Sequence, residues 1–482
     1  MKKRIFAAAL LVVMLVSAFA ILGACSERKP PDYVEGKINI TYYTWANQSE
    51  TALFQKLIDA FEAENEDIHV IIRNSDDDYT GNLALMMKGK QCPDIVQMKP
   101  GDIDTFLRAG ALESLTPYIN KSIEAGTMSQ DMIWDYNDAY RFNPQTNVRG
   151  NHEDELYSLI KDFSCDFVLN YNKNVVTDAV KAQIPEAKRS ADGYLSQTTP
   201  LTWSEFIKFA ASTQSGTLRG VSLDNEPLQQ LLEWIQQGGG SLWSDDHKQI
   251  VDIVNTPAVR QAFEHYRLMR DENTDNTANY IDSSSQVTRG PAQLMERTAA
   301  TTFYGLWAYA AYNMDRDATK CVTGFAPTPV PDNLEVTENT RYAGITALVG
   351  TSIMKNSANK EAAWKFIEYY FTEGQKLLAK QGSNIPGNKL VANNEFLNDP
   401  DISASQKAAN EFFYNLAMEH GFVIDFNKYL SQTSIEKVMS AQLSKYFADS
   451  KYKAYNESRW LQCLRDIRTN LQAELDMAVR NA

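Results

Sequence analysis

Short apolar runs alternate with amphipathic stretches through residues 37–108. Strands are predicted at 37–43, 68–73 and 94–98, because each run is short and rich in β-branched or aromatic side chains. After the first run, apolar residues recur at helical spacing on one face: Leu53, Phe54, Leu57, Ile58 and Phe61. A strand, helix, strand, helix, strand order is typical of a mostly parallel α/β sheet.

Further signals place a second set of elements later in the chain. A strand is expected at 167–170, and Thr202 with Glu205 three residues later is a capping box that starts a helix. Thr256 followed by Pro257 marks another helix start. Gly110 is placed to end a helix in a left-handed conformation.

Residues 1–24 predict an export signal. Three basic residues at positions 2–4 precede an uncharged run from Ile5 to Ala24. Because that run could span a bilayer, an uncleaved membrane anchor is the alternative. Residues 22–25, LGAC, resemble the lipobox of bacterial lipoproteins. The resemblance implies that Cys25 carries a diacylglycerol, that residues 25–36 form a tether, and that the protein is extracytoplasmic and lipid-anchored to the cell membrane.

Length and charge narrow the class of protein. Of 482 residues, 458 remain without the 24-residue leader, which is more than a single core usually supports, so two lobes are expected. Removing the three basic leader residues changes the formal net charge from −14 to −17. With no basic stripe in the sequence, nucleic acid is not expected as a partner. We predict a monomer with no cofactor.

Four further cysteines are scattered along the chain without a C-x-x-C pair. They could form disulfides outside the cell, but their spacing favours buried thiols. These residues are Cys92, Cys165, Cys321 and Cys463.

Several segments, taken in order, resemble the family 1 extracellular solute-binding proteins of ABC transporters, the group that contains maltose-binding and other sugar-binding receptors. The resemblance spans nearly all of the chain after the leader. The segments are ITYYTWANQSETALFQKLIDAFEAEN (40–65), KGKQCPDIVQM (88–98), AGALESLTPYI (109–119), ELYSLIKDFSCDFVLNYNKNVV (155–176), PLTWSEFIKFA (200–210), QGGGSLW (237–243), TTFYGLWAY (301–309) and NSANKEAAWKFIEYYFTEGQ (356–375).

The resemblance implies an α/β, two-lobed, periplasmic-binding-protein-like (type II) fold with hinge crossovers and a helical C-terminal part. Crossovers are expected near 161–166, 298–302 and 344–350. The first lobe is then expected to comprise 37–160 plus 300–350, and the second 161–299 plus 351–482. The implied function is to bind a small polar solute, most simply a sugar, in the cleft, and to deliver it to the permease subunits of an importer.

Candidate ligand-binding residues are of the two kinds that a sugar requires, flat aromatic rings and hydrogen-bonding side chains. Trp45 follows the first strand at its carboxyl end, where open α/β sheets place ligands. Trp307 matches the glycine and tryptophan pattern of the family, and Trp243 follows three glycines in the second lobe. The full set is Trp45, Asn47, Asp78, Asp224, Asn225, Trp243, Tyr304 and Trp307.

One acidic stretch partly matches a calcium-loop template. Asn276 replaces the glycine of the template and an aspartate replaces its last glutamate, so an Asn-rich surface loop is the favoured interpretation. The candidate ligands are Asp271, Asn273, Asp275, Thr277, Asn279 and Asp282.

Two other functions remain open. A secreted glycosidase would also use a cleft with tryptophans and carboxylates, but the sequence contains no G-x-S-x-G or H-E-x-x-H motif. A receptor of the same fold for a peptide, a polyamine or ferric iron is the second alternative. Tyr42 and Tyr43 alternate on a strand and therefore cannot both chelate one iron, whereas a polyamine would suit the acidic charge.

Overall fold

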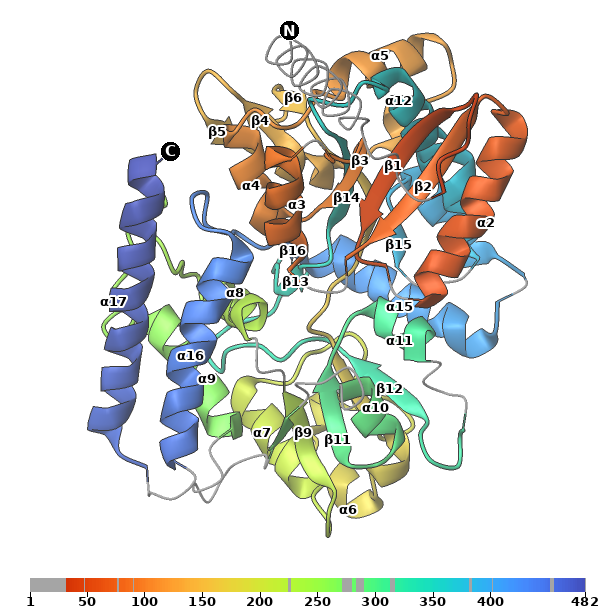
Figure 1. The fold of residues 1–482 in the computed structure, drawn as a ribbon. Coiled ribbons are helices and arrows are strands. Elements are labelled where there is room, and N and C mark those ends of the chain that lie inside the picture. The colour runs from red at the N-terminus through yellow and green to blue at the C-terminus, as the bar shows by residue number, and fades with distance from the viewer. Residues whose placement is uncertain are drawn as a thin grey trace, which may run out of the picture.

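The computed structural model describes the chain from residue 32, in the ranges 32–46, 48–75, 78–89, 91–223, 227–270, 280–282, 290–312, 317–380, 384–400, 402–450 and 455–481. Two sheets, each in its own lobe, organise these residues, and Figure 1 shows them at opposite ends of the molecule. This arrangement confirms the predicted two-lobed α/β fold.

The first lobe is built on a six-stranded sheet. β1 (Ile38–Thr44) pairs in parallel with β2 (Ile68–Asn74) and β3 (Ile95–Met98). Beyond β3 the order continues through β14 (Val349–Ile353), β7 (Leu159–Phe163) and β15 (Ile385–Pro386). The helices of this part of the chain are α2 (Gln48–Glu64), α3 (Tyr79–Lys88), α4 (Pro100–Arg108), α5 (Thr116–Glu124), α12 (Lys360–Tyr369), α13 (Gln375–Ala379), α14 (Lys389–Val391) and α15 (Ala404–His420).

The second lobe is built on a five-stranded sheet. Its order is β10 (Tyr280–Asp282), β9 (Arg219–Leu223), β11 (Ala299–Phe303), β8 (Leu169–Asn172) and β12 (Thr323–Ala326). Its helices are α6 (Asp178–Lys181), α7 (Trp203–Ser212), α8 (Leu228–Gln237), α9 (Pro257–Arg270), α10 (Gly290–Met295) and α11 (Leu306–Tyr312). The capping box of Thr202 and Glu205 starts α7 as predicted, and Gly110 has the expected positive φ of 61°.

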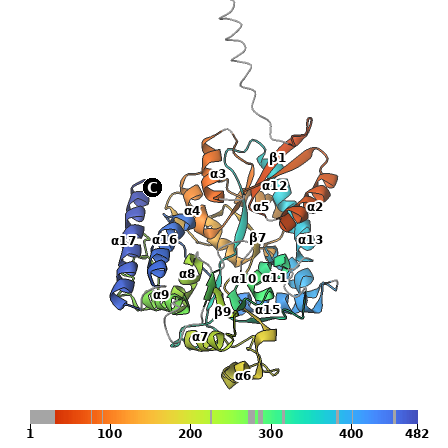
Figure 2. The ribbon, with the colours of Figure 1, turned by 60° about the horizontal axis from the view of Figure 1, so that its bottom comes forward.

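A C-terminal helical pair extends the second lobe. α16 (Gln432–Ser450) and α17 (Glu457–Asn481) pack on each other, and α16 also contacts α8. Their apolar side chains, Leu464 and Leu471 among them, join the core that contains Trp234 and Phe303. Both views place the pair along one side of the molecule (Figures 1 and 2).

Three segments connect the lobes. Residues 164–168 join β7 to β8, and residues 327–348 return from β12 to β14. The third runs from β16 (Gly421–Val423) toward α16. β16 pairs in parallel with β13 (Ala343–Ile345) of the second segment, and a backbone bridge between Cys165 and Ile345 joins the first two. A small meander of β5 (Val148–Arg149), β4 (Arg141–Asn143) and β6 (Glu155–Leu156) completes the strands.

The sheets correct part of the predicted lobe boundaries. β11 and β12 were expected in the first lobe, within 300–350, but both belong to the second sheet. Residues 299–303 are therefore a strand paired with β8 and β9, and the crossover expected at 298–302 is wrong. Conversely β15, expected in the second lobe, and β14, which the expected boundary after residue 350 divides, complete the first sheet. A short buried strand does not reveal from its own sequence which sheet will provide its hydrogen-bond partners.

Candidate functional site

The carboxyl ends of β1, β2 and β3 meet at one edge of the first sheet, where an aromatic cluster forms. Tyr79 stacks on Tyr43 with ring centroids 4.5 Å apart and meets the ring of Trp45 edge-on at 4.7 Å. The Tyr79 hydroxyl accepts from the Gln97 backbone N–H at 3.0 Å. Tyr42 points the other way, accepting from Gln97 Nε2 at 2.6 Å. The two tyrosines of β1 thus face opposite sides of the sheet, as predicted.

Lys99 brings a positive charge to this edge. It follows β3 and precedes α4, and its Nζ lies 5.2 Å from the centroid of the Trp45 ring, a cation–π contact. Burial raises the pKa of nearby Asp102 to about 6, and the Lys99 charge and the Gln432 backbone N–H oppose that rise. Lys99 therefore stabilises carboxylates that burial would otherwise neutralise.

The second lobe supplies a tryptophan held by a carboxylate. Trp307 lies at the start of α11, and its Nε1 donates to Asp166 Oδ1 at 3.1 Å. Tyr304 meets the Trp307 ring with centroids 5.5 Å apart. Gly305 allows this arrangement, because a Cβ there would lie 2.1 Å from Asp166 Oδ1. Burial raises the pKa of Asp166 to about 6, while the Lys99 charge and the Trp307 N–H lower it.

Lys99 of the first group, and Asp166, Tyr304 and Trp307 of the second, line a cavity of about 260 Å³ between the lobes. The volume is a little below the range of about 300–1,000 Å³ that is typical of small-molecule sites. Its walls combine four aromatic side chains with seven polar or charged ones, which suits a solute that carries both apolar faces and hydrogen-bonding groups. The lining residues are Lys99, Asp166, Phe167, Ser222, Leu223, Gln229, Gln230, Phe303, Tyr304, Trp307, Gln432 and Glu436.

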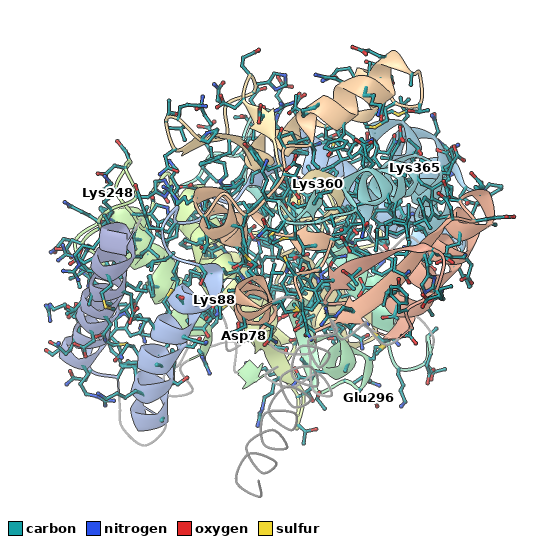
Figure 3. The ribbon with its side chains drawn as sticks, turned by 45° about the horizontal axis from the view of Figure 1, so that its top comes forward. Asp78, Lys88, Lys248, Glu296, Lys360 and Lys365 are labelled. Atoms are coloured by element: carbon teal, nitrogen blue, oxygen red, sulfur yellow. The ribbon has the colours of Figure 1, made fainter. Side chains whose placement is uncertain are left out.

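The predicted site residues fall into different environments. Tyr304 and Trp307 line the cavity, and Trp45 lies beside it, in contact with Lys99. Asp78 instead caps α3, accepting from the Gly81 N–H at 3.2 Å; it begins the helix that ends at Lys88 (Figure 3). That local hydrogen bond explains its position without a ligand.

Trp243 does not cover the site. It is 2% exposed, belongs to the core of the second lobe, and donates from Nε1 to Asp425 Oδ2 at 3.0 Å. The glycines before it bring the chain close to α9, since a Cβ on Gly240 would lie 2.7 Å from the Ala258 Cβ. The three glycines therefore indicate close packing, and the predicted role of Trp243 is corrected.

Several predicted residues lie outside the described residues. These are Asn47, Asp224 and Asn225 of the ligand set, Cys25 of the lipobox, and positions 271–279 of the calcium template, whereas Asp282 ends β10. Within the described ranges, no cluster of three or more metal-ligating side chains occurs. In the same ranges no disulfide joins Cys92, Cys165, Cys321 and Cys463, and no helix has the length and apolarity needed to cross a membrane.

The sequence did not reveal seven polar lining residues: Lys99, Asp166, Ser222, Gln229, Gln230, Gln432 and Glu436. Asp166 carried the clearest available signal, because it lies in the segment KDFSCDF that leads from one lobe to the other. Gln230 occupies an amphipathic helix, where a glutamine looks like any solvated residue. Gln432 and Glu436 are about 200 residues further along the chain, as the 208-residue separation of Leu228 and Glu436 illustrates.

A buried glutamate packs against the connections between the lobes. Glu233 of α8 is 1% exposed, and a Cβ on Gly344 would lie 3.1 Å from its side chain. Burial raises the pKa of Glu233 to about 8, opposed by the Gly344 N–H and reinforced by Asp166. The carboxyl group is therefore largely protonated at neutral pH.

The two hinged lobes and the cavity between them define a binding protein for a small solute. The model of the bacterial extracellular solute-binding protein family matches residues 45–377. This chain belongs to that family, as the sequence motifs predicted. Membership places it among extracytoplasmic solute-binding proteins.

Solved structures show the same fold at low sequence identity. An ABC substrate-binding protein from Listeria monocytogenes, in complex with cycloalternan, has a TM-score of 0.68 and 19% identity, over 90% of this chain and 99% of that one. Maltose-bound MalE3 from T. maritima has a TM-score of 0.64 and 17% identity, over 91% and 99%. UgpB from Mycobacterium tuberculosis, in complex with glycerophosphocholine, has a TM-score of 0.68 and 15% identity, over 92% and 100%.

Neutralising Glu233 should stabilise the protein at high pH. Because the folded state raises this pKa from 4.5 to about 8, its stabilising contribution is complete below pH 4.5 and is lost as the pH rises through 8. We expect Glu233→Gln to have a free energy of unfolding close to that of the wild type at pH 5. At pH 9 the variant should be more stable, by on the order of 3–5 kcal/mol.

Urea denaturation at pH 5, 7 and 9 measures this difference. Glu411→Gln is the matched control, because Glu411 is exposed on α15. A difference between Glu233→Gln and wild type that stays constant across the pH range would contradict a neutral Glu233 in the folded protein.

Proposed function

We propose that this protein binds a mono- or oligosaccharide in the interlobe cavity and delivers it to the permease subunits of an ABC importer. The observation that carries the proposal is Trp307, an aromatic ring fixed in the cavity wall by its hydrogen bond to Asp166. Sugars bind where a flat ring meets the C–H face of the pyranose and polar groups meet its hydroxyls.

The cavity is lined by residues of both lobes. Trp307, Tyr304 and Phe303 come from the second lobe, while Lys99 comes from the first. A solute that touches both walls binds the closed arrangement better than the open one, so it shifts the equilibrium between them toward closure. That differential affinity is what a receptor needs in order to present a loaded form to a transporter.

The solved relatives favour a carbohydrate. The Listeria protein holds cycloalternan and the T. maritima protein holds maltose. The mycobacterial protein holds glycerophosphocholine, so this fold also accepts other polyol derivatives. Among these, a neutral sugar best matches a cavity in which amides and aromatic rings predominate.

The proposed role is capture at the membrane surface as a monomer, without catalysis. Cys25 carries the lipid, residues 25–36 form the tether, and the ligand-binding set is Trp45, Tyr304 and Trp307 together with Asn47, Asp224 and Asn225. Two or more acyl chains give stable anchoring, whereas a single chain holds a protein only weakly.

A ligand screen tests the solute class. We expect maltose, maltotriose or cycloalternan to raise the melting temperature, because a ligand that binds only the folded state at 100 times its Kd stabilises it by about 2.7 kcal/mol. Spermidine, a tripeptide and glycerophosphocholine are the comparison solutes. The sugar assignment would be refuted if spermidine alone raised the melting temperature, or if no carbohydrate of a wider panel raised it.

Removing the Trp307 ring should weaken binding. Trp307→Ala is expected to raise the Kd for the sugar found in the screen by about tenfold or more, equivalent to about 1.4 kcal/mol. Trp307→Phe, which keeps a ring but loses the N–H donor to Asp166, should recover part of that affinity. Isothermal titration measures both, and an unchanged Kd in a folded Trp307→Ala variant removes this residue from the site.

Lipid attachment is tested by labelling. A bacterial host expressing the full chain with labelled palmitate should modify the wild type but not Cys25→Ser. Cys92→Ser is the control that must retain the label, since Cys92 lies beside β3 in the folded lobe. Equal labelling of wild type and Cys25→Ser would place the lipid elsewhere or show that none is attached.

A further inference from the structure

We infer that Gln230 is a ligand-contacting residue that helps to determine the solute, by donating a hydrogen bond from Nε2 into the cavity. This inference rests on the proposed function, because it concerns the same cavity. It goes further by specifying the solute's chemistry: an oxygen acceptor must face α8.

Gln230 combines deep burial with an unused donor. The residue is 3% exposed and lines the cavity, yet its Nε2 has no hydrogen-bond partner in the described part of the chain. Buried amide donors are nearly always paired, because leaving one unpaired forfeits its hydrogen bond to water. A donor of this kind in a cavity wall suits a partner that arrives with the solute.

Three other polar side chains of that wall have hydrogen-bond partners within the protein. Asp166 accepts from Trp307, and the Ser222 hydroxyl donates to Gln293 Oε1. Glu436 uses both oxygens: Oε2 accepts from the Leu228 N–H at 2.8 Å, and Oε1 accepts from the Ser440 hydroxyl at 2.6 Å. These three side chains hold the cavity wall in place, so the polar lining groups without a partner in the protein are the ones available to bind the solute.

The Glu436 contact also fixes where Gln230 lies. Leu228 is the first residue of α8, and its N–H is one of those that no helical carbonyl can satisfy. By accepting from it, Glu436 of α16 secures the first turn of α8 two residues before Gln230. The amide is therefore presented from a rigid element, which lowers the entropic cost of binding.

Gln432 supplies a complementary acceptor. It lies one turn before Glu436 on α16 and lines the same cavity, and its Oε1 is buried without a partner among the described residues. A hydroxyl group both donates and accepts, so neighbouring hydroxyls of a sugar can satisfy Gln230 Nε2 and Gln432 Oε1 together. An ammonium group cannot accept from Nε2, which disfavours a polyamine at this position.

The experiment compares two buried glutamines of α8. Gln237 is 4% exposed, but its Nε2 donates to the Tyr342 carbonyl at 2.7 Å. Methionine is close in shape to glutamine but has no N–H group, so it can form neither the proposed bond of Gln230 to the solute nor the bond of Gln237 to Tyr342. Gln230→Met and Gln237→Met are therefore compared in full-length protein, by melting temperature without ligand and by titration with maltotriose and the other sugars of the screen.

We expect Gln230→Met to raise the Kd by about tenfold or more and to leave the ligand-free melting temperature unchanged or higher. Gln237→Met should lower that temperature by about 2 °C or more with little effect on Kd. An unchanged Kd for Gln230→Met, while the wild type binds a sugar, overturns the inference and leaves the proposed function intact.

Failure of the wild type to bind any sugar has a different meaning, since it refutes the proposed function. The melting temperatures of Gln230→Met and Gln237→Met without ligand then show by themselves whether Gln230 forms a hydrogen bond within the protein. A fall in melting temperature as large as that of Gln237→Met shows a structural hydrogen bond and overturns the inference. No fall supports a donor that is kept for a ligand.

Discussion

Backbone pairing between the three interlobe segments is the constraint on which the rest of the molecule depends. The Cys165–Ile345 bridge and the β13–β16 pair tie together segments that are far apart in the chain. Each lobe has its own sheet, but the hydrophobic core of the first lobe also includes Leu294, Leu306 and Phe325 of the second. The shared segments set how the two lobes face each other, and thereby where a cavity can exist. Hinges of this kind concentrate backbone rotation in a few residues at element ends.

The hinge region holds carboxyl groups that water does not fully solvate. Asp166 lies on the first segment, while Glu233 packs against the second at Gly344. Asp166 contributes to the raised pKa of Glu233, and the Lys99 charge lowers the pKa of Asp166. Burial thus favours the protonated form of both carboxyl groups, while Lys99 and the N–H donors of Trp307 and Gly344 favour the ionised form. The same Asp166 positions Trp307, which couples hinge geometry to the aromatic wall of the site.

The polar groups of the cavity divide into two kinds. Asp166, Ser222 and Glu436 are satisfied within the protein and keep their neighbours in place. Gln230 and Gln432 retain capacity that a solute can use. The first kind of group preorganises the site, and the second kind can still form hydrogen bonds to the solute. It also explains why the C-terminal helices matter, since α16 supplies both Gln432 and the carboxylate that secures α8.

The sequence alone determined the elements and the class of protein. Short β-branched and aromatic runs located β1, β2 and β3, and a capping box located the start of α7, because those signals are local. Ordered motifs identified the family and pointed to Trp307. Local signals could not assign β11 and β12 to their sheet, since a strand's partners are chosen across the chain. Nor could they separate Trp243, a core ring, from Trp307, a cavity ring. Tertiary structure alone brought Asp166, Gln230 and Gln432 to one cavity, because side chains on three distant segments acquire a common environment only when the lobes fold and meet.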